Sequence, residues 1–280
     1  MMKEKVRKKL ETAVQKANIS LREDVFSLIK SAYRREKSPR GKKALGWIME
    51  NAFVAKKRKL PLCQDTGLPI VVVELGRGAV VEAGFIQEVK RVVEIAYGEN
   101  FFRPSLVDPL KRRPASYGPV LVHIELNLEI RGVKLTVLPK GFGSENKTRL
   151  KMFNPTASKE AIEEFVIESV QRAGPEACPP FVVGIGIGGT SERALFLAKY
   201  ALLDDLRKNA ANKTITAWQR KILKKINALN IGPMGLGGKT SALAVKIKTA
   251  STHIAGLPVG VNISCWALRS SSFTVSGREI

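Results

Sequence analysis

The spacing of apolar residues changes at about residue 60, and this change limits the folds open to the chain. Before that point apolar residues recur at helical intervals. The segment Ser20–Glu23 indicates a capping box that opens one helix, and the dipeptide Ser38-Pro39 opens another. The apolar stripe of the second helix is expected to carry Leu45, Ile48 and Phe53. After residue 60, short apolar runs and glycine-rich loops take over, which indicates strands.

Periodicity and breaker residues place the remaining elements. Helices are expected at 86–97, 159–173, 191–203 and 215–229, and strands at 70–73, 120–130, 133–137, 181–187, 242–248 and 258–263. The dipeptide Arg131-Gly132 predicts a turn between two strands that pair as an antiparallel hairpin, with one face of the hairpin exposed to solvent. Because helices do not alternate regularly with strands, we predict a mixed α/β (α+β) chain. It has a helical N-terminal region followed by a sheet-containing catalytic domain with glycine-rich loops.

The chain length fits one large domain or two small ones. At 280 residues with 44% hydrophobic residues, it is able to bury a substantial core. No polar or low-complexity linker marks a boundary, so we expect a single domain over 1–280, with a basic helical region at 1–60 inside it.

Basic residues are in large excess. The chain carries 47 Lys and Arg against 25 Asp and Glu, a net charge of +22, and residues 1–60 hold 18 of the basic and 6 of the acidic residues. Such an excess raises nucleic-acid binding as one function class. No zinc-finger or RNP motif accompanies it, and four Tyr and three Trp offer little base stacking. A solvated lysine-rich surface is the favoured interpretation, and such a surface is also suited to attract an anionic substrate or an acidic partner.

The N-terminal sequence, the lengths of the apolar runs and the use of cysteine bear on where in the cell the protein is expected. The N-terminus has basic residues without an apolar segment behind them, and the longest apolar runs are too short to span a bilayer. Three cysteines without a CxxC pair do not form a disulfide framework. We expect a cytoplasmic protein that meets no membrane.

Two glycine motifs resemble nucleotide-binding loops. Residues 184–189 fit GxGxxG, but Asp204 and Asp205 fall in the last turns of a helix rather than at the end of a second strand. Residues 237–240 read GGKT, but a P-loop needs Gly where the chain has Pro233. The P-loop is therefore excluded, and a dinucleotide enzyme remains as an alternative.

The three cysteines lie in loops or at strand ends, among Pro, Gly and polar residues. Distant cysteines are commonly small buried hydrophobes, but Cys63, Cys178 and Cys265 also suit a [4Fe–4S] cluster. A cluster held by three thiolates leaves one iron open as a Lewis acid, which favours non-redox chemistry. Asp65 follows Cys63 closely and suits acid–base work, and a further candidate lies at His253, in a small-residue turn.

Two cations suit an anionic substrate. Lys140 stands beside the glycine loop of 139–147, and Arg103 precedes a proline in a loop, where its guanidinium is suited to clamp a carboxylate.

Four segments carry a resemblance to a known family. They read LPLCQDTG at 60–67, PKGFGSENKTRL at 139–150, CPPFVVGIGIGGTSERA at 178–194, and GPMGLGGKTSALAVKI with THIAGLPVGVNISCWALR within 232–269. With these segments the chain resembles the α subunit of the two-subunit, iron–sulfur class I fumarate hydratases. It is closely similar to the α subunits of L-tartrate dehydratases.

The resemblance implies an activity and a set of site residues. The activity is that of a hydro-lyase of the tricarboxylic acid cycle, which reversibly hydrates fumarate to L-malate with a [4Fe–4S] cluster. The implied cluster ligands are Cys63, Cys178 and Cys265. The implied substrate-contacting residues are Gln64, Asp65, Arg103, Gly143 and His253, with Asp65 also in the acid–base network.

The resemblance also implies a partner. Single-chain relatives continue into a C-terminal domain, whereas this sequence stops at Ile280. We therefore expect a separate β subunit that completes the site, in a hetero-oligomer. The alternative within the family is an L-tartrate dehydratase α subunit, which converts tartrate to oxaloacetate. Outside the family, a dinucleotide-dependent enzyme and a basic nucleic-acid-binding protein are the remaining alternatives.

Overall fold

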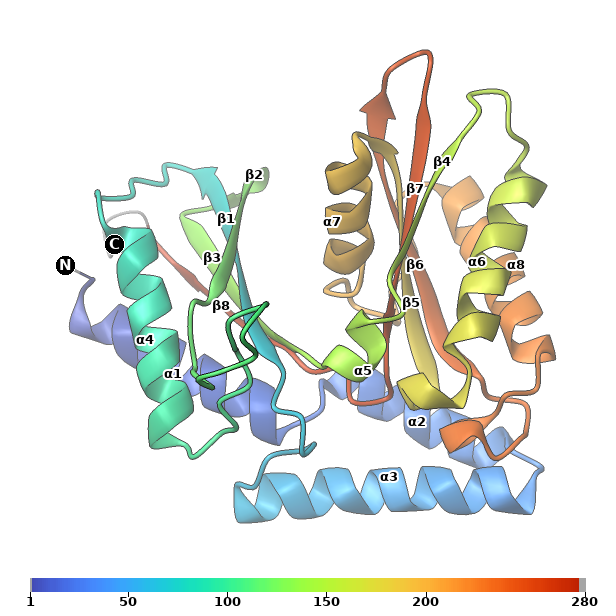
Figure 1. Cartoon of the computed structure of the whole chain (residues 1–280), viewed down its shortest axis with the longest axis horizontal. Helices are drawn as coiled ribbons and strands as arrows, with labels where there is room; N and C mark the ends of the chain where they lie inside the picture. Colours follow the sequence, from blue (N-terminus) through green and yellow to red (C-terminus); the bar gives the residue numbers. More distant parts are fainter. Residues whose placement is uncertain (1, 277–280) are drawn as a thin grey trace. The chain divides into compact units, whose positions relative to one another are not determined.

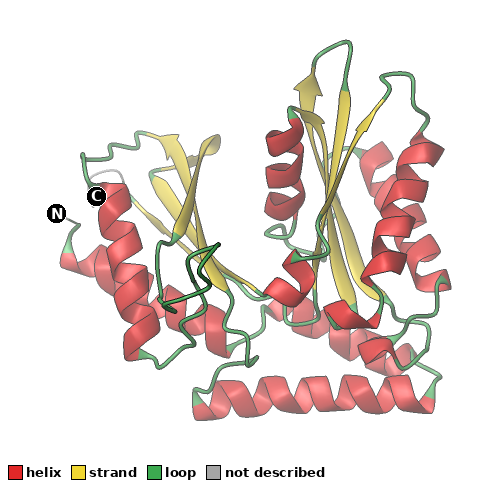
Figure 2. Ribbon diagram, viewed as in Figure 1, coloured by secondary structure: helices red, strands yellow, loops and turns green. Residues whose placement is uncertain are grey.

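The structure is a computed structural model that describes residues 2–276, and its secondary structure is drawn in Figures 1 and 2. Two compact units make up the described chain. Unit 1 comprises residues 2–22, 52–142 and 269–276, and unit 2 comprises residues 23–51 and 143–268. The helix α3 (Pro39–Arg58) begins in unit 2, and its residues from Ala52 onward belong to unit 1.

Unit 1 is built on a four-stranded mixed sheet in the order β2-β1-β3-β8. Its strands are β1 (Leu68–Arg77), β2 (Leu121–Arg131), β3 (Val133–Lys140) and β8 (Ser271–Val275). β1 pairs in parallel with β2 and antiparallel with β3, and β8 pairs antiparallel with β3.

Two helices cover one face of this sheet: α1 (Glu4–Ile19) and α4 (Phe85–Glu99). They contribute to one apolar core with the alternate residues of β1 and β3 that face them. Its fully buried members include Leu10, Val14, Val71, Val73, Val89, Val92 and Leu135. Burying each such side chain contributes about 1.5–3 kcal/mol, so this core fixes the sheet that carries the loop before β1.

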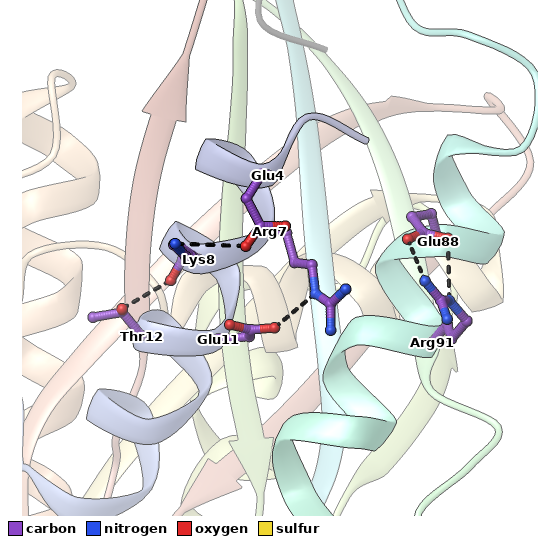
Figure 3. Close-up of polar contacts among 7 residues, drawn as sticks. All are labelled: Glu4, Arg7, Lys8, Glu11, Thr12, Glu88 and Arg91. Atoms are coloured by element: carbon purple, nitrogen blue, oxygen red, sulfur yellow. Dashed lines mark hydrogen bonds and ion pairs between the residues drawn. The ribbon is translucent and has the colours of Figure 1, made fainter. Parts of the chain in front are cut away.

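Several charged side chains of α1 and α4 pair within their own helices (Figure 3). Nε of Arg7 lies 2.9 Å from Oε1 of Glu11, and the guanidinium of Arg91 donates to both carboxylate oxygens of Glu88. Spacings of three or four residues place these partners on one helix face, as expected for a solvated charged surface.

Unit 2 contains a second four-stranded sheet, in the order β4-β7-β5-β6. Its strands are β4 (Arg149–Phe153), β5 (Phe181–Gly189), β6 (Ala242–Thr252) and β7 (Leu257–Ser264). β5 is parallel to β6 and antiparallel to β7. The helices of this unit are α2 (Glu23–Arg35), α5 (Phe142–Glu145, from its second residue), α6 (Lys159–Ala173), α7 (Ser191–Ala201) and α8 (Lys213–Ala228), with 3-10 turns at Pro175–Ala177 and Pro233–Gly235.

The two faces of β5 differ in side-chain size, and each takes a different helix layer. Val183 and Ile185 belong to the apolar core shared with α6 and α8. Gly184 and Gly186 lie under α7, where an added Cβ on Gly184 would approach the carbonyl oxygen of Ala198 to 1.9 Å. The motif over 184–189 is therefore strand β5 in close contact with a helix, and its glycines serve packing. The strand predicted at 181–187 is confirmed, and it extends to Gly189.

The α+β prediction is confirmed, and most expected elements are present. The predicted helix at 159–173 matches α6, whose Ser158 Oγ accepts a hydrogen bond from the main-chain N–H of Ala161 at 3.2 Å. Strands β4 and β8 were not expected from the sequence.

The predicted hairpin at Arg131-Gly132 is wrong. β2 and β3 do not pair with each other, because β1 lies between them. The turn crosses the end of β1 instead: Gly132 N–H donates to the carbonyl of Arg77 at 3.0 Å, and Gly76 N–H donates to the carbonyl of Gly132 at 2.8 Å. β1 is buried along most of its length, so it takes a central position and leaves β2 at the edge.

The apolar stripe of α3 also differs from the prediction. Leu45 and Ile48 are buried, but Phe53 is 64% exposed, and Ala52 and Ala55 continue the buried stripe. Among the described residues, no helix has both the length and the apolar character needed to cross a bilayer.

Candidate functional site

The loop before β1 holds Asp65 by both carboxylate oxygens. The main-chain N–H of Gly67 donates to Oδ1 at 2.9 Å, and the N–H of Phe142 donates to Oδ2 at 2.8 Å. The pairing of Leu68 with Lys140 brings these two segments together at the end of the sheet. The two N–H groups therefore fix the plane of the Asp65 carboxylate.

Gly67 is required by the close approach of this loop to β3. Its φ is +76°, and an added Cβ would lie 2.8 Å from the carbonyl carbon of Pro139. A larger residue would strain the backbone and push the loop away from the end of β3.

Helices α1 and α4 anchor the main chain of this loop. The N–H of Leu62 donates to the carbonyl of Asn18 at 2.9 Å, and the hydroxyl of Tyr97 donates to the carbonyl of Thr66 at 3.2 Å. Burial raises the pKa of Tyr97 to about 12, so the phenol stays protonated and keeps donating at neutral pH.

Three further candidate residues lie around the same loop of unit 1. The N–H of Arg103 donates to Oγ1 of Thr66 at 3.0 Å, which places Arg103 beside Asp65 in the fold. Arg103 and Gln64 are exposed, as a residue that meets a substrate needs to be. Lys140 is 1% exposed, so its ammonium group is held inside the protein.

Sequence reasoning missed Arg269. Its Nη2 donates a hydrogen bond to the carbonyl oxygen of Asp65, and its side chain is 2% exposed. Its position four residues after Cys265 was the one signal available in the sequence.

In unit 2, two of the three cysteine segments are joined. The main-chain N–H of Trp266 donates to the carbonyl of Cys178 at 3.2 Å. The pairing of Val182 with Ser264 places the start of β5 beside the end of β7, so both cysteines lie at this end of the sheet. Cys178 has φ 53° and ψ 68°, a left-handed conformation that is uncommon outside glycine and typical of a constrained site.

Gly143 lies in the short helix α5, which a polar network ties to β7. Glu145 accepts hydrogen bonds from Lys199 Nζ at 2.6 Å and from Asn262 Nδ2 at 2.9 Å. Asn262 Nδ2 also donates to Thr148 Oγ1 at 2.8 Å. Gly143 is exposed, and the network holds its neighbours in place.

His253 is not brought to the two cysteines of unit 2. It is exposed in the turn between β6 and β7, where its Nδ1 accepts a hydrogen bond from the N–H of Ala255 at 3.1 Å. β7 separates the turn from Cys265, and its eight residues span about 26 Å at 3.3 Å per residue. His253 and Cys265 therefore lie at opposite ends of one strand.

The cysteine thiols are the candidate donors for a cofactor. Cys63, Cys178 and Cys265 form no disulfide and are half-buried; the first is in unit 1 and the other two are in unit 2. Within the part of the chain that the structure describes, no three His, Cys, Asp or Glu side chains gather closely enough to hold a metal ion. Thiolates are the ligands of iron–sulfur clusters. The joined segments carry Cys178 and Cys265 at the same end of the unit 2 sheet.

Known proteins are similar to this chain over most of its length. Residues 7–274 match the family model described as fumarate hydratase (Fumerase). A protein of Methanocaldococcus jannaschii, named provisionally as L(+)-tartrate dehydratase subunit alpha, is 42% identical over 262 residues, which are 91% of this chain and 92% of that protein. The L(+)-tartrate dehydratase subunit alpha of Escherichia coli strain K12 is 27% identical over 257 residues, which are 90% of this chain and 85% of that protein.

Proposed function

The chain belongs to the fumarate hydratase family and is a hydro-lyase, and from this premise we propose that it is the α subunit of a [4Fe–4S] enzyme that interconverts fumarate and L-malate. A separate β subunit completes the enzyme. The observation that carries the proposal in this chain is the Asp65 loop, which presents an acid–base carboxylate two residues after a free thiol.

The donor set supports the cluster. Cys178 and Cys265 lie on irregular backbone at the same end of the unit 2 sheet, and Cys63 is the third thiolate. When bound, a cluster with three thiolate ligands supplies an open iron that acts as a Lewis acid on the substrate hydroxyl and carboxylate.

The remaining chemistry comes from side chains of this chain. Asp65 moves the proton, because its carboxylate is held in one plane by two N–H groups and has no cation bonded to it among the described residues. The exposed Arg103, whose main-chain N–H donates to Thr66 Oγ1 in the same loop, clamps a substrate carboxylate. The exposed Gln64 and Gly143 complete the proposed substrate contacts. Lys140, whose side chain is buried, and His253, at the far end of β7 from Cys265, are given no contact.

The partner is supported by the relatives, which are named as subunit alpha. The net charge of +22 suits attraction of an acidic partner surface and of a dicarboxylate. If this charge contributes to docking, the affinity of the two subunits falls as salt rises to about 0.5 M, where the Debye length is well below 10 Å. An affinity that does not change with salt would show that the charge has no role in docking the two subunits.

A second candidate within the family is L-tartrate dehydratase, which the names of the relatives favour. Turnover of fumarate and L-malate against L-tartrate, measured with the completed enzyme under anaerobic conditions, separates the two. Faster turnover of L-tartrate would move the assignment to that substrate and leave the roles of Asp65 and the cysteines unchanged.

The role of Asp65 is tested by Asp65→Asn. The variant is expected to keep its iron and lose turnover. Asp108→Asn is the matched control, because Asp108 Oδ1 also accepts two main-chain N–H bonds but lies in an exposed turn. Wild-type kcat in Asp65→Asn would remove Asp65 from the mechanism.

A further inference from the structure

Unit 1 contains a buried guanidinium, that of Arg269. The side chain is 2% exposed, and it stands just before β8, where the start of β8 meets the end of β3. A charged group inside a protein is costly unless hydrogen bonds or an opposite charge compensate it, so a buried Arg at this place needs an explanation.

Arg269 is sparsely bonded for a buried cation. Among the described residues its hydrogen bond runs from Nη2 to the carbonyl oxygen of Asp65. Its Nε is buried and has no hydrogen-bond partner. Buried donors are nearly always hydrogen-bonded. Because Nε of Arg269 is not, the burial of this side chain is not explained by the hydrogen bonds that it makes.

The guanidinium holds the main chain of Asp65 and leaves its carboxylate free of an ion pair. The carboxylate oxygens accept from the N–H groups of Gly67 and Phe142 instead. Arg269 and Asp65 have opposite electrostatic effects on the buried phenol of Tyr97: Arg269 lowers the pKa of Tyr97 and Asp65 raises it, while burial is the largest cause of its upward shift. Both charges therefore lie within electrostatic range of one side chain.

The bond to Asp65 completes a set of anchors on the loop. The carbonyl of Asn18 holds Leu62, the hydroxyl of Tyr97 holds Thr66, and the guanidinium of Arg269 holds Asp65, which lies between Cys63 and Thr66. Arg269 is the one anchor of these three that brings a charge.

We propose that Arg269 is a positioning residue that fixes Asp65 for proton transfer by binding its main-chain carbonyl while leaving its carboxylate to the two N–H groups. The inference rests on the proposed function. It adds a second residue to the acid–base machinery, one that acts through Asp65.

The test compares Arg269→Met with Arg269→Lys in the enzyme completed with its partner subunit. We expect Arg269→Met to lower kcat by about 100-fold, because a small misplacement of a reacting group has an effect of that size. KM for the dicarboxylate, the iron content and the visible absorption of the cluster are expected to stay close to wild type. Arg269→Lys keeps a charge and a donor and is expected to recover part of the lost kcat.

A matched control separates positioning from loss of a buried cation. Lys246 is 5% exposed, and its Nζ also donates to a main-chain carbonyl, that of Lys208, but in unit 2. Lys246→Met is expected to lower the melting temperature and leave kcat unchanged. Chemical rescue gives a second readout: millimolar guanidinium ion is expected to restore kcat in Arg269→Ala, and equal sodium chloride is not.

The proposal is overturned if Arg269→Met keeps wild-type kcat with its iron present. It is also overturned if kcat falls only in proportion to iron content, or if guanidinium gives no rescue of Arg269→Ala. These failures are distinct from failure of the proposed function, which would appear as wild-type enzyme that takes up no iron or turns over no dicarboxylate. An active Asp65→Asn variant would remove Asp65 from the mechanism and, with it, the positioning role of Arg269.

Discussion

The main-chain N–H of Trp266 donates a hydrogen bond to the carbonyl oxygen of Cys178 at 3.2 Å, so the segments of two cysteines 87 positions apart in the chain are fixed to each other. The bond joins two backbone atoms, so it sets the distance between the segments independently of their side chains. It gives unit 2 a preformed pair of thiol-bearing segments.

This backbone bond is expected to support cofactor retention. Trp266→Pro removes the N–H, whereas Trp266→Phe keeps it and preserves an aromatic ring. We expect Trp266→Pro to lose iron faster than Trp266→Phe when both are incubated with a chelator. Equal rates of iron loss would show that the bond between these segments is dispensable for the site.

The glycines of β5 are expected to matter for stability and not for nucleotide binding. Gly184→Ala places a Cβ 1.9 Å from the carbonyl oxygen of Ala198, so α7 has to move, which typically costs about 1–3 kcal/mol or more. Gly256→Ala is the control, since no atom lies within 4 Å of its Cβ position. Urea denaturation checks both variants, and NAD binding by calorimetry in the wild type would contradict the packing role.

Glu36 is expected to make stability depend on pH. Its carboxylate is 4% exposed and accepts hydrogen bonds from the N–H groups of Ser38 and Lys239 and from the hydroxyl of Thr240. Burial favours the neutral acid, but these bonds outweigh it and hold the pKa of Glu36 below its ordinary value of 4.5. The ionised form therefore stabilises the fold above about pH 4.5, and this contribution is lost as the pH falls through the lowered pKa.

The matching experiment uses Glu36→Gln. At neutral pH the variant is expected to be less stable by about 1–3 kcal/mol, the cost of losing hydrogen bonds to a buried charge. The difference from wild type is expected to shrink as the pH is lowered toward about 3. A difference in the free energy of unfolding that stays constant over this range would contradict the account.

Local patterns in the sequence predicted individual helices and strands better than they predicted which strands pair. Ser158 and the apolar spacing after it were sufficient for α6, because a cap and a stripe are local properties. The pairing of β2 and β3 was not predictable in this way. A turn at Gly132 is compatible with a hairpin, and the insertion of β1 between the strands depends on burial along the whole sheet.

The same limit applies to the candidate site. The motif around Cys63 and Asp65 was visible in the sequence, and the structure places Arg103 beside it through Thr66. The bond from Arg269 to Asp65 joins residues 204 positions apart, and no local pattern signals it. His253 is twelve positions before Cys265, a spacing that suggests proximity, but an intervening strand carries the chain away.

The most direct test of the central claim is the amount of iron and acid-labile sulfide per chain after anaerobic purification. We predict about four of each in the wild type and loss of the cluster in Cys63→Ser, Cys178→Ser and Cys265→Ser, with Ser264→Ala as a control beside one of the cysteines. The four variants and the wild type are compared by circular dichroism to show that each is folded. Folded wild-type protein that takes up no iron on reconstitution, or cysteine variants that keep the full cluster, would contradict the assignment.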